Sequence, residues 1–506
     1  MNLDWRVCSR ARLSRDPRFD GKFFIGVIGS RVYCRPICPA PTAKEKNCRY
    51  FPTAAAAAEA GFRPCLRCRP ECSPGTPAWA GTPSTVSRAL RLIGESGLED
   101  GGVELLAERL GVGSRHLRRL FLRHLGATPS AVAQTRRLHF AKKLIDETRL
   151  PIGEVALASG FGSVRRFNAA IRQVYHRTPT QIRRLARQNA TQTEQQYFFR
   201  LRYRPPYHWA NLLAFLAARA TPGVEAVELG RYRRSISLNG NDGYFETELD
   251  EANHTLAVRV QFPDPRALFV ITERIRAMFD LNADWAVIAR ALRTDPFLAQ
   301  PVDAHPGLRV PGCWDGFELA VRAILGQQIT VKGATMLAGR LAQRFGRPFA
   351  AGSLTHIFPT PEILAEADLA IIGLPKARAA TIRALARAVR DGQIRFEGIV
   401  NVEEFLDRLC EIPGIGPWTA QYVAMRALGE PDAFPAGDLA LLRALNLEAA
   451  RDLQQRAEAW RPWRAYATMY LWKIAAPPKS AGKPTAPRDL LPARASQGGT
   501  PSALRI

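Results

Sequence analysis

The chain has 506 residues, of which 46% are hydrophobic, and it carries a formal net charge of +25. Its length allows three or four domains with sizeable cores, which excludes a wholly disordered protein. The positive charge favours a polyanionic partner such as DNA, although an arginine-rich proteome would explain part of it.

Four cysteines near the N-terminus stand in two close pairs that 26 residues separate: Cys34, Cys38, Cys65 and Cys68. This spacing suits one tetrahedral Zn²⁺ ion, because each pair can bind the metal while the intervening chain folds back. The residues alone leave two roles open. The site is either closed and structural, which is the commoner case, or it contains a nucleophilic thiolate. Cys48 and Cys72 belong to neither pair, and we interpret them as free thiols.

Both pairs have distinctive neighbours, in Tyr33-Cys-Arg-Pro-Ile-Cys38 and Ala60-Gly-Phe-Arg-Pro-Cys-Leu-Arg-Cys68. These segments resemble the N-terminal zinc domain of the Ada methyl-response family, over about residues 4–72. The resemblance implies that Cys34 irreversibly accepts a methyl group from a DNA methylphosphotriester and that the other three cysteines complete the zinc site. The chemistry agrees, because a metal-bound cysteine remains a thiolate, which is its nucleophilic form.

A Pro/Gly-rich linker over 73–83 precedes a helical block, residues 84–187, with 19 Lys/Arg against 8 Asp/Glu. Residues 103–125 predict a helix that stops at Gly111, followed by a turn and a second helix with Ser114 as its expected N-cap. A weaker copy of this pattern covers 152–172. The early turns of the two second helices carry the arginines expected to contact DNA in the major groove, Arg115, Arg118, Arg119, Arg165 and Arg166.

One such unit is usually an ordinary helical hairpin, but two units about 50 residues apart, closed by Thr178-Pro179, resemble the AraC-type DNA-binding domain. The resemblance implies transcription activation triggered by methylation, with promoter DNA and RNA polymerase as partners. Loss of thiolate charge at Cys34 would reduce its repulsion from DNA phosphates. The chain lacks the Pro-Cys-His-Arg motif of a methylguanine methyltransferase, so we expect no repair of O6-methylguanine.

After a polar linker over 188–195, the region 197–283 alternates apolar and polar residues, which predicts strands at 235–238 and 255–260 and a helix over 209–219. The pattern over 284–475 is helical, and we expect the tail, 476–506, to be disordered.

Residues 412–420, Ile-Pro-Gly-Ile-Gly-Pro-Trp-Thr-Ala, predict a helix-hairpin-helix turn. The backbone at Gly414 and Gly416 can approach a DNA phosphate closely, because no side chain intervenes. An ordinary helix-breaking turn explains this segment equally well. Asp438 follows Trp418 by 20 residues, and on its own it is better explained as the N-cap of the next helix.

Together, the hairpin and Asp438 resemble the helix-hairpin-helix DNA glycosylases. Further segments, including Tyr203-Arg-Pro-Pro-Tyr-His-Trp209 and Arg322-Ala-Ile-Leu-Gly-Gln-Gln328, resemble the AlkA alkylbase glycosylases over 197–475. The resemblance implies that Asp438 is catalytic and that Trp418, Tyr422 and Trp472, otherwise readily explained as core residues, form a pocket for a cationic base. Gln328 stands at the position of the family's wedge residue, where an apolar leucine is common.

Glycosylases that also cleave the strand carry a lysine where this chain has Trp418. We therefore expect hydrolysis of the glycosidic bond, which excises 3-methyladenine and 7-methylguanine from DNA, without strand cleavage. The predicted fold is multidomain and mainly α with α+β parts: a zinc domain (4–72), an AraC-type double helix-turn-helix (84–187), an AlkA-like N-terminal α+β domain (197–283) and an all-α glycosylase domain (284–475).

Two other functions remain open. The chain could be a regulator whose C-terminal half only binds damage, or a repair enzyme whose N-terminal half only anchors it to DNA. No signal peptide or membrane-spanning run is present, and the cysteine usage suits a reducing compartment. We expect a monomer in the bacterial cytoplasm, on nucleoid DNA.

Overall fold

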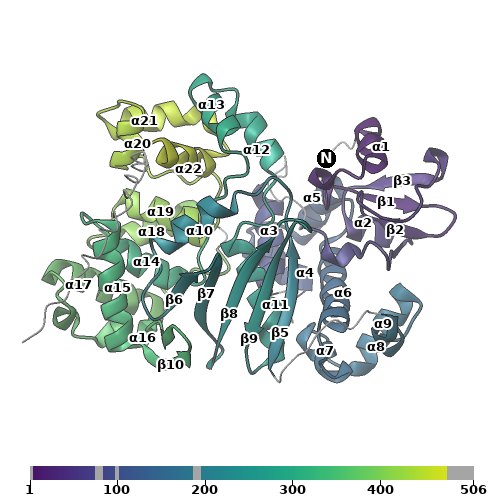
Figure 1. Cartoon of the computed structure of the whole chain (residues 1–506), viewed down its shortest axis with the longest axis horizontal. Coiled ribbons are helices and arrows are strands. Elements are labelled where there is room, and N and C mark those ends of the chain that lie inside the picture. Colours follow the sequence, from purple (N-terminus) through teal and green to yellow (C-terminus); the bar gives the residue numbers. More distant parts are fainter. Residues whose placement is uncertain (1–3, 75–83, 97–101, 186–194, 400, 476–506) are drawn as a thin grey trace, which may run out of the picture.

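The computed structural model describes residues 4–74, 84–96, 102–185, 195–399 and 401–475. The predicted linkers lie mostly, and the predicted disordered tail wholly, outside these residues. Figure 1 shows the N-terminal part on the right, a sheet in the centre and the C-terminal helices on the left. None of the described helices combines the length and apolar character needed to cross a membrane.

The four cysteines lie around a small four-stranded sheet of order β3-β1-β2-β4. Its strands are β1 (Phe24–Val27), β2 (Val32–Cys34), β3 (Cys48–Phe51) and β4 (Arg63–Pro64), and its helices are α1 (Trp5–Leu13) and α2 (Ala54–Glu59). Strands β2 and β4 pair in parallel, with Tyr33 opposite Pro64. This register brings Cys34, which ends β2, next to Cys65, which follows β4.

Seven helices form the next block: α3 (Ser84–Ser96), α4 (Gly102–Arg109), α5 (Ser114–Leu125), α6 (Pro129–Glu147), α7 (Ile152–Ala158), α8 (Val164–Tyr175) and α9 (Pro179–Leu185). Both predicted helix-turn-helix units are present, as α4–α5 and α7–α8. The predicted cap at Ser114 is wrong, because Gly113 is the N-cap and Ser114 is already helical. In the second unit, Ser163 caps α8 through a bond from the Arg166 N–H.

In the part of the helical block that the structure describes, the buried hydrophobic side chains belong to two cores shared with neighbouring regions. Buried residues of α3–α5, such as Leu117 and Phe121, share a core with Phe24 and Phe62 of the cysteine-rich region. Buried residues of α6–α8 share another core with the central sheet. The two helix-turn-helix units are therefore each packed against a different neighbour, and helix α6 joins them.

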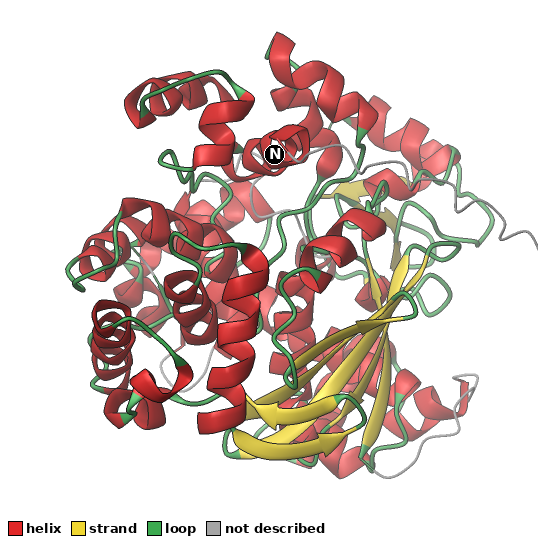
Figure 2. Cartoon of the chain, turned by 60° about the vertical axis from the view of Figure 1, so that its left-hand side comes forward, coloured by secondary structure: helices red, strands yellow, loops and turns green. Residues whose placement is uncertain are grey.

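The central sheet is antiparallel, with order β5-β9-β8-β7-β6. Its strands are β5 (Gln196–Arg202), β6 (Glu225–Glu228), β7 (Arg231–Leu238), β8 (Asn241–Asp250) and β9 (Thr255–Gln261), with helices α10 (Trp209–Ala217) and α11 (Leu268–Met278). Figure 2 shows the twist of this sheet. Both predicted strands and the predicted helix are confirmed, because they fall in β7, β9 and α10.

The C-terminal part is helical around the largest core. Its helices are α12 (Trp285–Leu292), α13 (Pro296–Ala304), α14 (Gly316–Leu325), α15 (Val331–Phe345), α16 (Pro361–Glu366), α17 (Lys376–Arg390), α18 (Val402–Cys410), α19 (Pro417–Ala427), α20 (Leu439–Ala444), α21 (Ala450–Ala457) and α22 (Arg464–Ala475). The sequence missed one hairpin, β10 (Arg347–Ala351) with β11 (Leu354–Ile357). It extends the edge of the domain towards β7.

Candidate functional site

The four paired cysteines converge on one point. Their sulfur atoms all lie within 4.8 Å of one another. In a tetrahedral site with Zn–S bonds of 2.3 Å, the sulfur atoms are about 3.8 Å apart, so this cluster fits one zinc ion with little adjustment. Cys48 and Cys72 lie outside the cluster: the Cys48 thiol contacts Arg12, and the Cys72 thiol is 4.0 Å from Glu147 Oε1.

The four sulfur atoms differ in accessibility. Cys65 and Cys68 are buried, with 8% and 6% of their surface exposed, whereas Cys34 and Cys38 are half-buried. The backbone N–H of Arg35 also donates to Cys68 Sγ at 3.3 Å, which makes that sulfur less nucleophilic. Of the four, Cys34 and Cys38 are therefore the more accessible to an external electrophile.

We expect one zinc ion per chain. The double change Cys65→Ser/Cys68→Ser removes both buried sulfurs and should abolish binding, because two ligands cannot hold the metal. Metal analysis of the purified full chain measures this. The matched control is Cys48→Ser/Cys72→Ser, which should retain the full equivalent of zinc. Undiminished zinc in the first variant would contradict the four-cysteine site.

The cysteine cluster is directly connected to the helix-turn-helix block. Tyr33, the residue before Cys34, shares a hydrogen bond of 2.9 Å with His139 Nε2 on α6. Arg69, the residue after Cys68, forms an ion pair of 3.0 Å with Asp146 on the same helix. Burial lowers the pKa of His139 to about 4, so this histidine is neutral at physiological pH. The metal site is therefore in contact, through Tyr33 and Arg69, with the helix that connects the two helix-turn-helix units.

The five predicted DNA-contacting arginines all have exposed side chains: Arg115, Arg118, Arg119, Arg165 and Arg166. Within the first unit, Arg118 forms an exposed ion pair of 3.1 Å with Glu104, and Arg119 lies 2.9 Å from the His116 ring. Such exposed contacts are weak and would not hold these side chains away from DNA.

The predicted base-pocket residues lie around one cavity of about 620 Å³ in the C-terminal half. Its lining includes Trp418 and Tyr422 from α19, Trp472 from α22, and Asp438. The rings of Trp418 and Tyr422 are stacked, with centroids 5.4 Å apart and planes inclined by 9°. The ring centroid of Trp472 lies 6.3 Å from that of Tyr422. The structure therefore brings together all four residues, which the sequence spreads over 55 positions.

Asp438 uses its two carboxylate oxygens differently. Oδ1 accepts hydrogen bonds from the N–H groups of Ala440 (2.9 Å) and Leu441 (3.2 Å), so Asp438 is indeed the N-cap of α20. Oδ2 accepts a bond of 3.1 Å from the Trp418 indole N–H. The capping role and a place in the cavity are thus compatible, because each needs only one oxygen.

The cavity residues that the sequence did not assign to the pocket include Phe215, Arg219 and Arg426. The Arg219 guanidinium lies 3.8 Å from the centre of the Phe215 ring, and that of Arg426 lies 4.9 Å from the same ring. Arg426 is bound to the carbonyls of Pro311 and Gly312, and burial lowers the pKa of Arg219. The sequence offered one signal for these arginines: each follows an aromatic residue by four positions, Phe215 before Arg219 and Tyr422 before Arg426, which in a helix places ring and guanidinium on one face.

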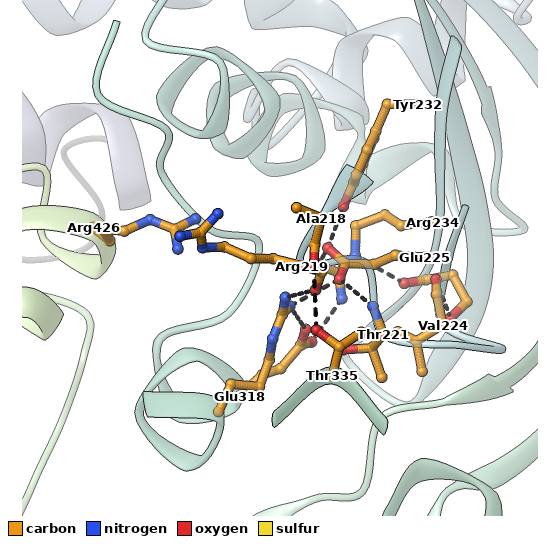
Figure 3. Close-up of polar contacts among 12 residues, drawn as sticks. Ala218, Arg219, Thr221, Val224, Glu225, Tyr232, Arg234, Glu318, Thr335 and Arg426 are labelled. Atoms are coloured by element: carbon orange, nitrogen blue, oxygen red, sulfur yellow. Dashed lines mark hydrogen bonds and ion pairs between the residues drawn. The ribbon is translucent and has the colours of Figure 1, made fainter. Parts of the chain in front are cut away.

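A buried ionic network fixes this wall of the cavity, and Figure 3 shows it with Arg219 and Arg426 beside it. Arg322 on α14 binds Glu225 and Glu318, both at 2.9 Å, and Arg234 on β7 binds Glu318 at 2.7 Å. Burial alone would raise the pKa of Glu225, but Arg322 and Arg234 lower it. Arg322 also donates to the Arg219 carbonyl, so the network connects the sheet to the cavity.

The predicted hairpin is present between α18 and α19. Gly414 has φ +92°, and a Cβ there would meet Thr381 Oγ1 at 2.2 Å, so only glycine fits. Gly416 is exposed, and a Cβ would meet nothing within 4 Å. Packing within the protein therefore does not require glycine at 416. The backbone there is open to an external group. Gln328 is exposed in the loop between α14 and α15, with φ +58°.

Sequence models of four protein families match successive parts of the chain. They are the metal binding domain of Ada (7–71), a helix-turn-helix domain (106–185), the AlkA N-terminal domain (198–315) and the HhH-GPD superfamily of base excision DNA repair proteins (321–462). Their order is that of the regions described above.

Similar proteins cover both halves of the chain. A protein of Mycobacterium tuberculosis named probable bifunctional transcriptional activator/DNA repair enzyme AlkA is 42% identical over 481 residues, 93% of this chain and 97% of the relative. DNA-3-methyladenine glycosylase 2 of Escherichia coli is 36% identical, covering 54% of this chain and 96% of the relative. The structure of the 3-methyladenine DNA-glycosylase from Archaeoglobus fulgidus aligns with a TM-score of 0.50 and 25% identity, over 55% of this chain and 98% of that one.

Proposed function

The chain belongs to the family of bifunctional transcriptional activator/DNA repair enzymes, and from this premise we propose which residues perform each activity. The C-terminal half is a DNA-3-methyladenine glycosylase, the zinc region accepts methyl groups, and the helix-turn-helix region makes the protein a DNA-binding activator. One observation carries the assignment of the catalytic centre: the carboxylate of Asp438, held by Trp418, faces an aromatic cavity.

Base release uses this geometry as follows. The flipped base enters the cavity and packs against its aromatic wall of Trp418, Tyr422 and Trp472, which attracts a cationic alkylpurine. As the glycosidic bond breaks, its electron pair moves to the base, which becomes neutral, and positive charge develops on the sugar. Asp438 stabilises that charge and orients the water that attacks the sugar.

Arg219 and Arg426 contribute to the same step through their charge. Beside the base they disfavour its cationic form and favour the neutral form that is released, while Asp438 stabilises the charge on the sugar. Trp418 stands where a Schiff-base lysine would be needed, so the product is an intact abasic strand.

The methyl-accepting step needs only an accessible thiolate. Cys34, Cys38, Cys65 and Cys68 would hold the zinc ion, which when bound would keep the sulfurs deprotonated. Cys34 Sγ attacks the methyl carbon of the phosphotriester, an S–C bond forms, and the C–O bond breaks with its electrons on the phosphate oxygen. The product is an ordinary phosphodiester, and the cysteine remains methylated.

Activation follows from the loss of negative charge at Cys34. The cysteine cluster then repels DNA phosphates less, and the five exposed arginines of α5 and α8 bind promoter DNA more tightly. We further propose that the protein is a monomer that contacts RNA polymerase, and that it works in the cytoplasm on nucleoid DNA. The four-part division given by the sequence, 4–72, 84–187, 197–283 and 284–475, is our proposal for its domains.

Trp418→Phe tests the proposed catalytic centre. Phenylalanine retains an aromatic face but loses the N–H that holds Asp438 Oδ2. A hydrogen bond to a charged group contributes about 1.5–3 kcal/mol, so single-turnover base release should fall roughly 10- to 100-fold. The matched control is Trp460→Phe, which removes a similar bond, to Asp295, outside the cavity. It should lower the melting temperature but leave the rate of the folded protein unchanged. Equal rates in the two variants would contradict the proposal.

A further inference from the structure

One glutamine connects the hairpin to the loop that carries Gln328. The side-chain amide of Gln327 donates to the Gly414 carbonyl at 2.9 Å and to Thr419 Oγ1 at 3.2 Å. The backbone carbonyl of Gln327 accepts a bond of 2.7 Å from Arg378 on α17. The hairpin turn, α19 and α17 are therefore all bound to this residue, which lies 87 positions before Gly414.

The next residues form an exposed tip beside the base cavity. Gln328 adopts the left-handed conformation, and Ile329 and Val331 are 39% and 43% exposed although both line the cavity. The Thr330 side chain caps α15 through the Gly333 N–H at 3.2 Å, which fixes the far end of the loop. The near end is fixed by Gln327. The tip is thus held at both ends, while its side chains remain free to meet DNA.

We propose that Gln327 is a positioning residue for base flipping, which sets the depth of the Gln328 tip relative to the DNA backbone held by the hairpin. This rests on the proposed glycosylase function and on two roles that the sequence predicts: Gly414 and Gly416 contact a DNA phosphate, and Gln328 fills the space left by the flipped base. A glutamine side chain has many rotamers and loses much entropy when it is inserted, so it needs a rigid support. The Gln327 amide provides this support at the hairpin itself.

The test compares one lesion in two pairing states. The substrate is a duplex with a single 7-methylguanine, placed opposite cytosine or opposite an abasic analogue. Flipping costs less free energy when the lesion is unpaired, so a flipping defect should affect mainly the paired substrate. The variant is Gln327→Met, which keeps the size and adds no charge, and the control is Gln343→Met, at an exposed glutamine on α15.

We expect Gln327→Met to slow single-turnover excision of the paired lesion about tenfold or more, with the unpaired lesion and the melting temperature unchanged. Gln343→Met should match the wild type on both substrates. In a Gln328→Ala background, Gln327→Met should add no further loss, because the two residues act through one tip. Equal losses on both substrates, no loss on either, or additive losses in the double variant would overturn the proposal.

Failure of the proposed function can be distinguished from failure of this inference. If Asp438→Asn excised both substrates like the wild type, the assignment of the catalytic centre would be wrong whatever Gln327 did. If the wild type excised both but Gln327→Met did not discriminate between them, only the positioning role would be lost.

Discussion

Asp438→Asn is expected to slow base release by a factor on the order of 10²–10³, the usual cost of losing one well-placed electrostatic group. Asparagine can still cap α20 through its carbonyl oxygen, so the fold should persist. Its NH₂ group would instead face the Trp418 indole N–H, and no negative charge would remain beside the sugar. The measurement is the single-turnover release of 3-methyladenine or 7-methylguanine, together with binding to the same damaged duplex, which should be retained.

The matched control for this change is Asp315→Asn. Asp315 caps α14 through a bond of 2.7 Å from the Glu318 N–H, and it lies outside the base cavity. It should release bases at the wild-type rate. If Asp438→Asn also stayed within a few-fold of the wild type, Asp438 would be only a helix cap. Product strands should be intact abasic DNA, and a protein–DNA crosslink trapped by borohydride would show that a lysine cleaves the strand.

Methyl transfer from DNA methylphosphotriesters should label Cys34 and no other residue. Within the cluster, Cys65 and Cys68 are buried, so Cys34 and Cys38 are the more accessible to a phosphotriester. The family resemblance selects Cys34. Mass spectrometry of digests of the wild-type protein should find a gain of one CH₂ group on the Cys34 peptide, and Cys34→Ser should abolish uptake completely.

Because Cys34→Ser also removes a metal ligand, the mapping on the wild type is the decisive measurement. Cys48→Ser serves as the control, since that thiol lies outside the cluster and its loss should change neither uptake nor zinc content. A methyl group found mainly on Cys38 or Cys72 would assign the acceptor elsewhere. Methyl uptake by Cys34→Ser would likewise show that another residue is the acceptor.

The sequence by itself determined the features that depend on short-range spacing. Each close cysteine pair, each helix-turn-helix pattern and the Pro-Gly-Ile-Gly turn lies within one short segment of the chain. Such patterns specify ligands and turns directly, because their geometry is set by local backbone conformation. The prediction of a cap at Ser114 shows the limit of this reasoning. The N-cap is Gly113, one residue earlier, and glycine is also accepted at that position.

Only the tertiary structure decided how these local features act together. The sequence posed capping and catalysis as alternatives for Asp438, and the structure shows that Oδ1 caps α20 while Oδ2 is bound to Trp418, so capping does not exclude the proposed catalytic role. Arg219 is held at the cavity by the ionic network between the sheet and α14, and Arg426 by the carbonyls of Pro311 and Gly312, and these contacts join residues about a hundred positions apart. The contact of Gln327 with Gly414 depends in the same way on two distant turns meeting. No local pattern encodes such contacts, because they exist only after the separate elements have packed.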